Sequence, residues 1–132
     1  MKPNYRRNLK KSLTVLKIKI NITYMIPEDI LAKIKSGAVV RVSEIIKEGD
    51  KERISNFKGV VIARKHGQEI GATFTVRADL GGVGVEKVYP INSPAIAKVE
   101  ILSSPKKIHR AKLYFLRKIS KKVSRQKIGV AA

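Results

Sequence analysis

The sequence predicts a small domain of mostly β-structure, folded as a strongly bent barrel or sandwich. Between residues 38 and 102, short apolar segments follow one another with turn residues between them and no long helix. The chain has 132 residues, which fits one domain, and 43% of them are hydrophobic, close to the usual value for globular proteins. These observations favour a single β-rich core over a multidomain or disordered chain.

A basic arm and two short elements precede this core. Residues 1–12 show no apolar periodicity and are expected to be solvated or to become ordered on a partner. Residues 16–24, LKIKINITY, alternate between apolar and polar side chains, which predicts a half-buried strand. Pro27 with neighbouring acids and then Gly37 predict a short helix, because proline is favoured in the first helical turn and glycine just after the last.

Five strands are expected next, separated by turns that contain glycine. Gly59, in the middle of the second strand, predicts a bulge or a bend, because glycine inside a strand often marks such an irregularity. The stretch GGVG, residues 81–84, is expected to form a hairpin tip. The predicted strands cover residues 38–46, 52–65, 72–80, 83–91 and 95–102.

The last element is predicted to be a basic helix. Ser104 can cap this helix and Pro105 can occupy its first turn. Apolar side chains then recur at helical spacing, which predicts a narrow apolar face that docks on the barrel. They are Ile108, Ala111, Phe115 and Ile119, with Leu116 beside them. The predicted parts are a basic extension (1–26), a barrel with a leading short helix (27–103), and a basic helix and tail (104–132).

The net charge of +19 is concentrated at the two ends of the chain. From Glu28 to Glu100, ten acids face twelve Lys and Arg, so this part carries only +2. Seven basic residues precede it and ten follow it, with no acid in either end. Because like charges on a folded surface repel one another, this distribution is typical of a protein whose ends rest on a polyanion.

Several functional classes are excluded by what the chain lacks. The absence of cysteine excludes disulfides and thiolate chemistry, and no stretch reaches the roughly 18 apolar residues of a membrane span. His66 is expected in an exposed turn and His109 within the basic run, and neither has an acid at metal-ligand spacing. The stretch GGVGVE, residues 81–86, lacks the lysine and the following helix of a phosphate-binding loop. We therefore predict no catalytic residue, metal, cofactor or membrane partner.

Binding to nucleic acid is the function that remains. Each Lys or Arg that neutralises a phosphate releases counterions, which gives a salt-dependent gain in affinity without sequence recognition. Tyr114 lies off the apolar face of the expected helix. Its ring would either stack on a base or ribose, or pack against a neighbouring lysine stem.

Three phrases of the sequence resemble the family of bacterial-type large-subunit ribosomal protein nineteen. They are RISNFKGVVIARKHG (53–67), TFTVRADLGGVGVEKVYPINSPAIAKVEIL (73–102) and RAKLYFLR (110–117). The resemblance implies an SH3-like β-barrel that binds ribosomal RNA in the large ribosomal subunit. It also implies a place near the subunit interface, beside another small-barrel ribosomal protein and close to small-subunit RNA.

The candidate RNA-binding residues come from the motif positions and from the charged ends. The motif positions that the resemblance places near RNA are Arg53, Lys58, Arg64, Lys65, Arg77, Arg110, Lys112, Tyr114, Arg117 and Lys118. The charged ends add Arg6, Arg7, Lys10, Lys11, Lys106, Lys107, Lys121, Lys122, Arg125 and Lys127.

Two features depart from the family pattern. The family has an acidic-leaning helix and a P-G-D turn before the first barrel strand, whereas this chain has AKIKSGAVVRV (32–42) and retains only Gly37. Residues 1–25 have no counterpart. They are interpreted as an extension into RNA, an organellar targeting segment or an upstream start before Met25. We favour the extension, because transit peptides are rich in Arg and Ser and this segment carries mostly Lys.

Two other functions and two hosts stay open from the sequence. A free nucleic-acid chaperone, or a translation or transcription factor with a similar barrel, is the second hypothesis, and an enzyme is the third. The ribosome is expected to be either the cytoplasmic ribosome of a bacterium or an organellar one.

Overall fold

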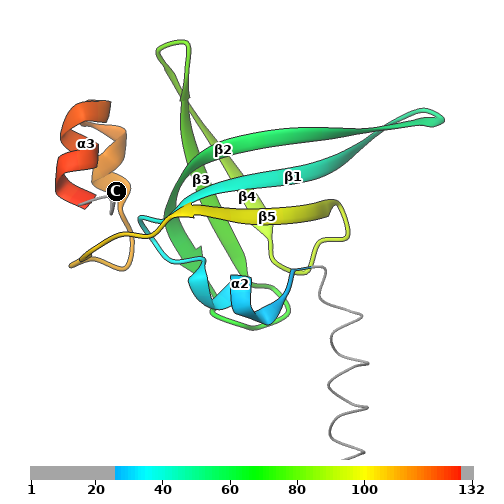
Figure 1. Ribbon diagram of the computed structural model, residues 1–132, viewed down its shortest axis with the longest axis horizontal. Coiled ribbons are helices and arrows are strands. Elements are labelled where there is room, and N and C mark those ends of the chain that lie inside the picture. The colour runs from blue at the N-terminus through cyan, green and yellow to red at the C-terminus, as the bar shows by residue number, and fades with distance from the viewer. Residues whose placement is uncertain (1–25, 129–132) are drawn as a thin grey trace, which may run out of the picture.

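The computed structural model describes residues 26–128, apart from the side chains of residues 125 and 126. The basic arm and the strand expected at residues 16–24 lie outside the described residues. The elements are α2 (Glu28–Lys33), β1 (Val39–Glu48), β2 (Lys51–Lys65), β3 (Thr73–Leu80), β4 (Val83–Pro90), β5 (Ile96–Ser103), the 3₁₀ helix η1 (Tyr114–Arg117) and α3 (Lys121–Ile128) (Figure 1). The prediction of five strands is confirmed, because each observed strand overlaps its predicted range closely.

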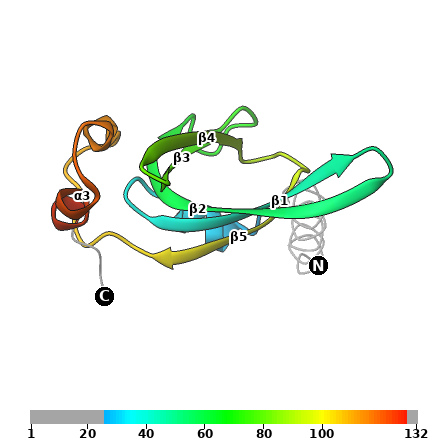
Figure 2. The same cartoon turned by 90° about the horizontal axis from the view of Figure 1, so that it is seen from above.

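The five strands form one antiparallel sheet in the order β4-β3-β2-β1-β5. Strand β2 curves strongly, so that β3 and β4 lie over β1 and β5 (Figure 2). The sheet is nevertheless open, since no ladder joins β4 to β5 in the described part of the chain. The prediction of a mostly β, strongly bent fold is confirmed, but the sheet does not close into a barrel. Leu31 of α2 and Ile34, just after the helix, are buried in the main core. The helix therefore helps to shield the core from solvent, although the sheet does not close.

The main core shows why these segments form strands. Alternate side chains of β1 (Val40 and Val42) and of β3 (Phe74, Val76 and Ala78) are buried in one cluster. This period of two places every second side chain on the inner face of the sheet. Tight turns connect the strands: Gly81 and Gly82, for example, have φ angles of 61° and 82° and join β3 to β4. Glycine adopts such positive φ angles without the steric cost that other residues meet.

Gly59 is required for a close approach of two strands and does not itself form a bulge. Its pairing with Val40 is regular, and the irregularity of β2 lies nearby, where Ile62 is an extra residue between two positions paired with β3. A Cβ at Gly59 would overlap the carbonyl oxygen of Arg77 and lie 2.8 Å from Cγ1 of Val76. The prediction of a local irregularity in β2 was thus correct in its neighbourhood and wrong in its position.

The predicted C-terminal helix beginning at Ser104 was wrong. Residues 104–113 are not helical, and only η1 and the two-turn helix α3 follow them. One physical reason is charge, because a continuous helix would place Lys106 beside Arg110 and Lys118 beside Lys122 at a spacing of four, where like charges repel. The other reason is packing on β2, which needs an extended course through residues 104–113.

Candidate nucleic-acid interface

The C-terminal segment, defined here as residues 106–128, is anchored on β2. The N–H of Leu113 donates a hydrogen bond of 2.7 Å to the carbonyl of Ile62, the bulged residue. A bulge turns one side chain away from the regular alternation, and the Ile62 side chain accordingly packs against Leu113, Leu116 and Ile128 in a second buried cluster. The hydroxyl of Ser36 also donates to the carbonyl of Ala111. The segment is therefore held on the folded domain by both apolar and polar contacts.

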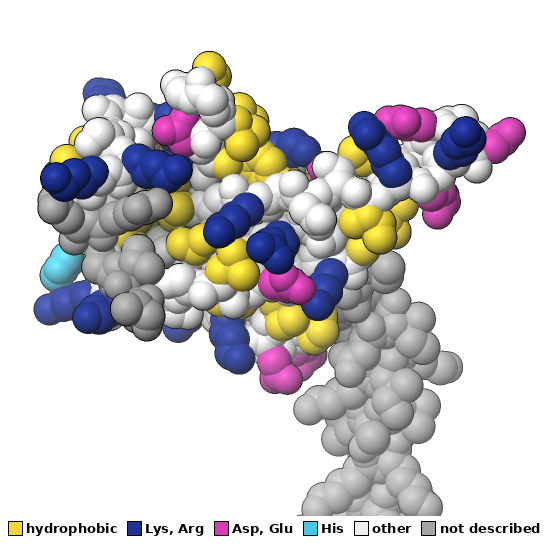
Figure 3. Space-filling view, turned by 45° about the horizontal axis from the view of Figure 1, so that its top comes forward, with side chains coloured by type: hydrophobic (Ala, Val, Ile, Leu, Met, Phe, Trp, Pro, Cys, Tyr) yellow, Lys and Arg dark blue, Asp and Glu magenta, His cyan; other side chains and the backbone are white. Residues whose placement is uncertain are grey.

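This anchored segment presents a surface on which positive charge far exceeds negative charge. It contains ten Lys and Arg and no acid. Figure 3 shows Lys and Arg gathered around it, at the left of the view, whereas the end of the β1–β2 hairpin at the right carries charges of both signs. The exposed cations of the segment are Lys106, Lys107, Arg110, Lys112, Arg117, Lys118, Lys121, Lys122 and Lys127.

One acid outside the segment ties it to the sheet. Glu86 of β4 accepts two hydrogen bonds from Arg117, of 2.8 and 2.9 Å, and one of 2.8 Å from Arg77 of β3. The guanidinium of Arg117 also lies over the ring of Tyr114, 4.7 Å from its centroid. Glu86 thus fixes two arginines and, through one of them, the orientation of η1.

The described residues contain no arrangement suited to catalysis by a metal. No group of three His, Asp or Glu side chains among residues 26–128 is placed to hold an ion. No helix in the same range has the length and apolar character needed to cross a bilayer. What the geometry offers is an anchored cationic surface, which is suited to binding an extended anion.

A family comparison agrees with this surface. The model of the family "Ribosomal protein L19" matches residues 17–128 of the chain. The chain belongs to the ribosomal protein L19 family. Members of the L19 family are structural proteins of the large ribosomal subunit, where they associate with ribosomal RNA and other proteins. The resemblance read from the three sequence phrases is therefore confirmed. The expectation that residues 1–25 have no counterpart in the family was wrong for residues 17–25, which the match includes.

In this L19-family chain, three further arginines among the predicted RNA-binding residues, besides Arg117, have partners within the protein. Arg77 is paired with Glu86, and Arg53 lies 2.9 Å from Glu48 on the exposed β1–β2 hairpin. Arg64 donates to the backbone carbonyls of Leu31, Ile34 and Gly67. Its guanidinium thereby satisfies carbonyls at the end of α2, and burial lowers the pKa of Arg64. These contacts give Arg64 a structural role whether or not it also touches RNA.

The other predicted residues divide by position. Lys58 and Lys65 are exposed on β2, and Tyr114 is exposed on η1. The ring of Tyr114 packs against the guanidinium of Arg117 and not against a lysine stem. Stacking of this ring on RNA stays a prediction. Arg6, Arg7, Lys10, Lys11 and the side chain of Arg125 lie outside the described residues.

Two residues of the interface were missed in the sequence. Glu86 was placed in the predicted strand 83–91 without a functional role, and no local signal links it to an arginine 31 residues later. Phe115 had been assigned to the docking face of a helix, whereas it is half-buried between the guanidinium of Arg110 and the ammonium of Lys127. Both arrangements depend on how distant segments meet.

The charge of Glu86 is expected to make stability depend on pH. The two hydrogen bonds from Arg117, more than the single one from Arg77, hold the pKa of Glu86 below its ordinary value. The resulting stabilisation is fully present above the pKa of the unfolded chain, about 4.3, and is lost as the pH falls through the lower folded value. We expect Glu86→Gln to reduce the free energy of unfolding by about 1 kcal/mol at pH 7, as for a partly exposed ion pair.

Urea denaturation at several pH values would measure this effect. The difference between the native chain and Glu86→Gln should shrink below about pH 4, because the native carboxyl is then protonated as well. Glu69→Gln is the matched control, since Glu69 is exposed in the turn before β3. A difference between Glu86→Gln and the native chain that persists unchanged in acid would show that the carboxylate charge is not the cause.

Proposed function

We propose that this L19-family protein binds and stabilises ribosomal RNA in the large subunit, near the subunit interface, without catalysis. The observation that carries this proposal is the anchored C-terminal segment, with ten Lys and Arg and no acid. A rigid attachment places these cations on one side of the domain, where each phosphate contact would release counterions. Small-subunit RNA and neighbouring ribosomal proteins are the further partners that we propose.

The proposed architecture has three parts. The curled five-stranded sheet, with residues 27–103, supports an SH3-like arrangement despite its open edge. Residues 104–132 form the RNA-binding C-terminal part. Residues 1–26 form a basic extension that contacts RNA, since their cations have no acid among them to balance their charge.

Cleavage of RNA from a single engineered cysteine would test the proposed site. The chain has no cysteine, so Ser120→Cys gives one attachment point for an iron chelate in the cationic segment. We expect hydroxyl radicals from this position to cleave large-subunit RNA in assembled particles. Cleavage of small-subunit RNA in whole ribosomes would support the interface location. A chelate at Asp50→Cys, on the tip of the β1–β2 hairpin, is the control for position.

Washing the particles separates a subunit component from a free RNA-binding factor. The affinity of the isolated protein for RNA should fall steeply as the salt concentration rises. In a plot of log K against log salt, each phosphate contact should contribute about 0.7 to 0.9 to the negative slope. Inside the subunit, many simultaneous contacts should keep it bound through a high-salt wash. Release in that wash, with no cleavage of large-subunit RNA from Ser120→Cys, would contradict the proposed function and favour a chaperone or factor.

A further inference from the structure

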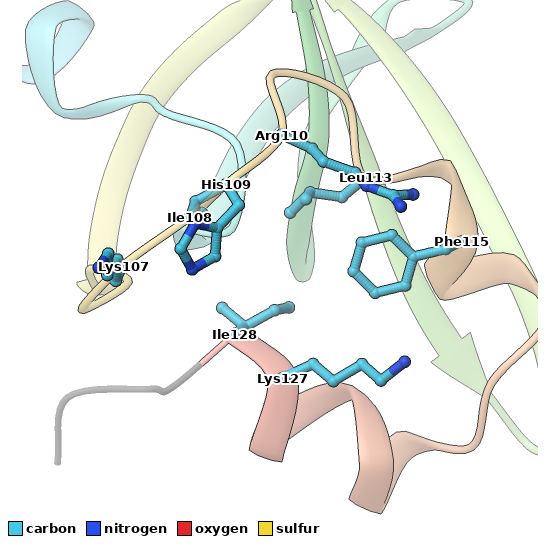
Figure 4. Close-up of a pocket in the computed structure, with 8 residues that line it drawn as sticks. All are labelled: Lys107, Ile108, His109, Arg110, Leu113, Phe115, Lys127 and Ile128. Carbon is cyan, nitrogen blue, oxygen red and sulfur yellow. The ribbon is translucent and has the colours of Figure 1, made fainter.

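A pocket of about 380 Å³ lies between the extended part of the C-terminal segment and helix α3 (Figure 4). Its volume is within the range of roughly 300 to 1,000 Å³ that is usual for small-molecule sites. Its lining contains apolar and basic side chains and no acid. The lining residues are Lys107, Ile108, His109, Arg110, Leu113, Phe115, Lys127 and Ile128.

The apolar floor of this pocket is held in place by the folded domain. Leu113 and Ile128 are buried in the cluster that includes Ile62 of β2. Ile108 packs against Gly37, where a Cβ would overlap Cδ1 of Ile108 and lie 3.3 Å from Cγ2 of Ile128. The bare glycine backbone therefore lets both isoleucines close in on one side. The floor is thus built from contacts with the core and is not a chance gap at the surface.

One aromatic ring and two cations form the wall. The ring of Phe115 has the guanidinium carbon of Arg110 at 5.6 Å and the ammonium of Lys127 at 5.5 Å from its centroid. Figure 4 shows this ring between the two cationic side chains and turned toward Ile128. Attraction to the ring offsets part of the repulsion between the cations. The ring carries no net negative charge, so the two cations are not neutralised. The pocket should therefore bind an anionic ligand more tightly than a neutral one.

We propose that this pocket binds one unpaired nucleotide of ribosomal RNA, a proposal that rests on the proposed function. The base lies against Phe115 and the apolar floor, and the flanking phosphates contact Lys107, Arg110 and Lys127. Proteins commonly bind unpaired RNA in this way, by combining an aromatic or guanidinium surface for the base with cations for the backbone. The proposal adds a point of base recognition to an interface otherwise built on charge.

The apolar floor favours a nucleotide over a simple anion or an acidic peptide. Phosphate would use the cations but would leave the half-buried side chains of Ile108 and Phe115 in contact with water. An acidic peptide would bring carboxylates but no flat ring to cover Phe115. A nucleotide supplies both a flat apolar surface and a negative charge, which matches both halves of the lining.

Methyl and aromatic NMR spectra of the full chain would test the proposal without any substitution. The probes are a short single-stranded RNA, an abasic strand of the same length and charge, inorganic phosphate and a glutamate peptide. We expect the RNA to shift the resonances of Phe115, Ile108 and Ile128. The abasic strand, phosphate and peptide should leave these three nearly unchanged, even where they bind to the lysines.

Variants at the ring then separate stacking from charge. Phe115→Leu should weaken binding of the base-containing RNA about tenfold, because it removes the aromatic surface on which the base stacks. It should leave binding of the abasic strand unchanged, and Phe115→Tyr should restore the preference. Lys127→Gln should weaken both strands alike, because it removes a phosphate contact. Thermal denaturation of each variant shows whether the domain is still folded.

The outcomes distinguish this proposal from the proposed function. If RNA binds but the three pocket residues do not respond, or respond equally to the abasic strand, the nucleotide pocket is wrong and the RNA-binding surface stands. An equal response to phosphate or to the glutamate peptide also overturns the pocket proposal. If none of the nucleic-acid probes binds and the chain is absent from washed subunits, the proposed function fails as well.

Discussion

Replacing Gly59 by valine is expected to destabilise the domain by about 4 kcal/mol or more, a large part of the stability of a typical small protein. The added Cβ would overlap the carbonyl oxygen of Arg77, and its methyl groups would enter space that Val76 already occupies. Overpacking usually costs about 1 to 3 kcal/mol, and more when the obstacle is backbone that cannot rotate away. The clash lies where β2 begins to pair with β3, next to the pair Val60 and Arg77, so relief would require these two strands to separate.

Urea denaturation and thermal melting would measure this loss. Gly71→Val is the matched control, because a Cβ at Gly71 meets no heavy atom within 4 Å. The control should change the free energy of unfolding by no more than about 1 kcal/mol. An unchanged melting temperature of Gly59→Val would show that the strands do not approach as closely as the structure places them.

The strands could be predicted from sequence because their signal is local. Alternation of apolar and polar side chains, and glycines at the turns, specify β1 to β5 almost to the residue. Closure of the sheet depends instead on how far the two edge strands lie apart after the curl of β2, which no short stretch encodes. The irregular course of residues 104–113 is also set at a distance, by Ile62 and Gly37.

The positive charge of the candidate site could be predicted from the sequence, but the intramolecular partners of its arginines could not. A segment with ten cations and no acid indicates a polyanion whatever its conformation. Whether an individual arginine is free to bind a phosphate depends on its neighbours in space. Arg64 donates its hydrogen bonds to backbone carbonyls, and Arg77 forms an ion pair with Glu86. Among the described motif residues, the exposed lysines are therefore the better candidates for phosphate contacts.

Reversing Lys118, Lys121 and Lys122 to glutamate is expected to abolish stable incorporation into the large subunit while the domain remains folded. All three side chains are exposed, and the described structure gives them no ion pair. Each reversal removes one phosphate contact and adds one repulsion. Affinity for large-subunit RNA should fall about 100-fold or more, and the dependence of log K on log salt should become shallower by about 2 to 3.

A triple variant of equal charge isolates position from net charge. Lys35, Lys47 and Lys51 are exposed outside the C-terminal segment. Of these three, only Lys47 has an ion pair in the described structure, at 3.3 Å from Glu52, and such exposed pairs contribute little energy. Reversing them lowers the net charge by the same six units. If only the overall electrostatic attraction to RNA mattered, both variants would lose RNA affinity equally. If the phosphates lie against the C-terminal segment, only the variant reversed at Lys118, Lys121 and Lys122 should be missing from washed subunits. Incorporation is measured by letting each tagged variant compete with the native chain during assembly. Equal incorporation of both variants would mean that the charge of this segment is incidental to assembly.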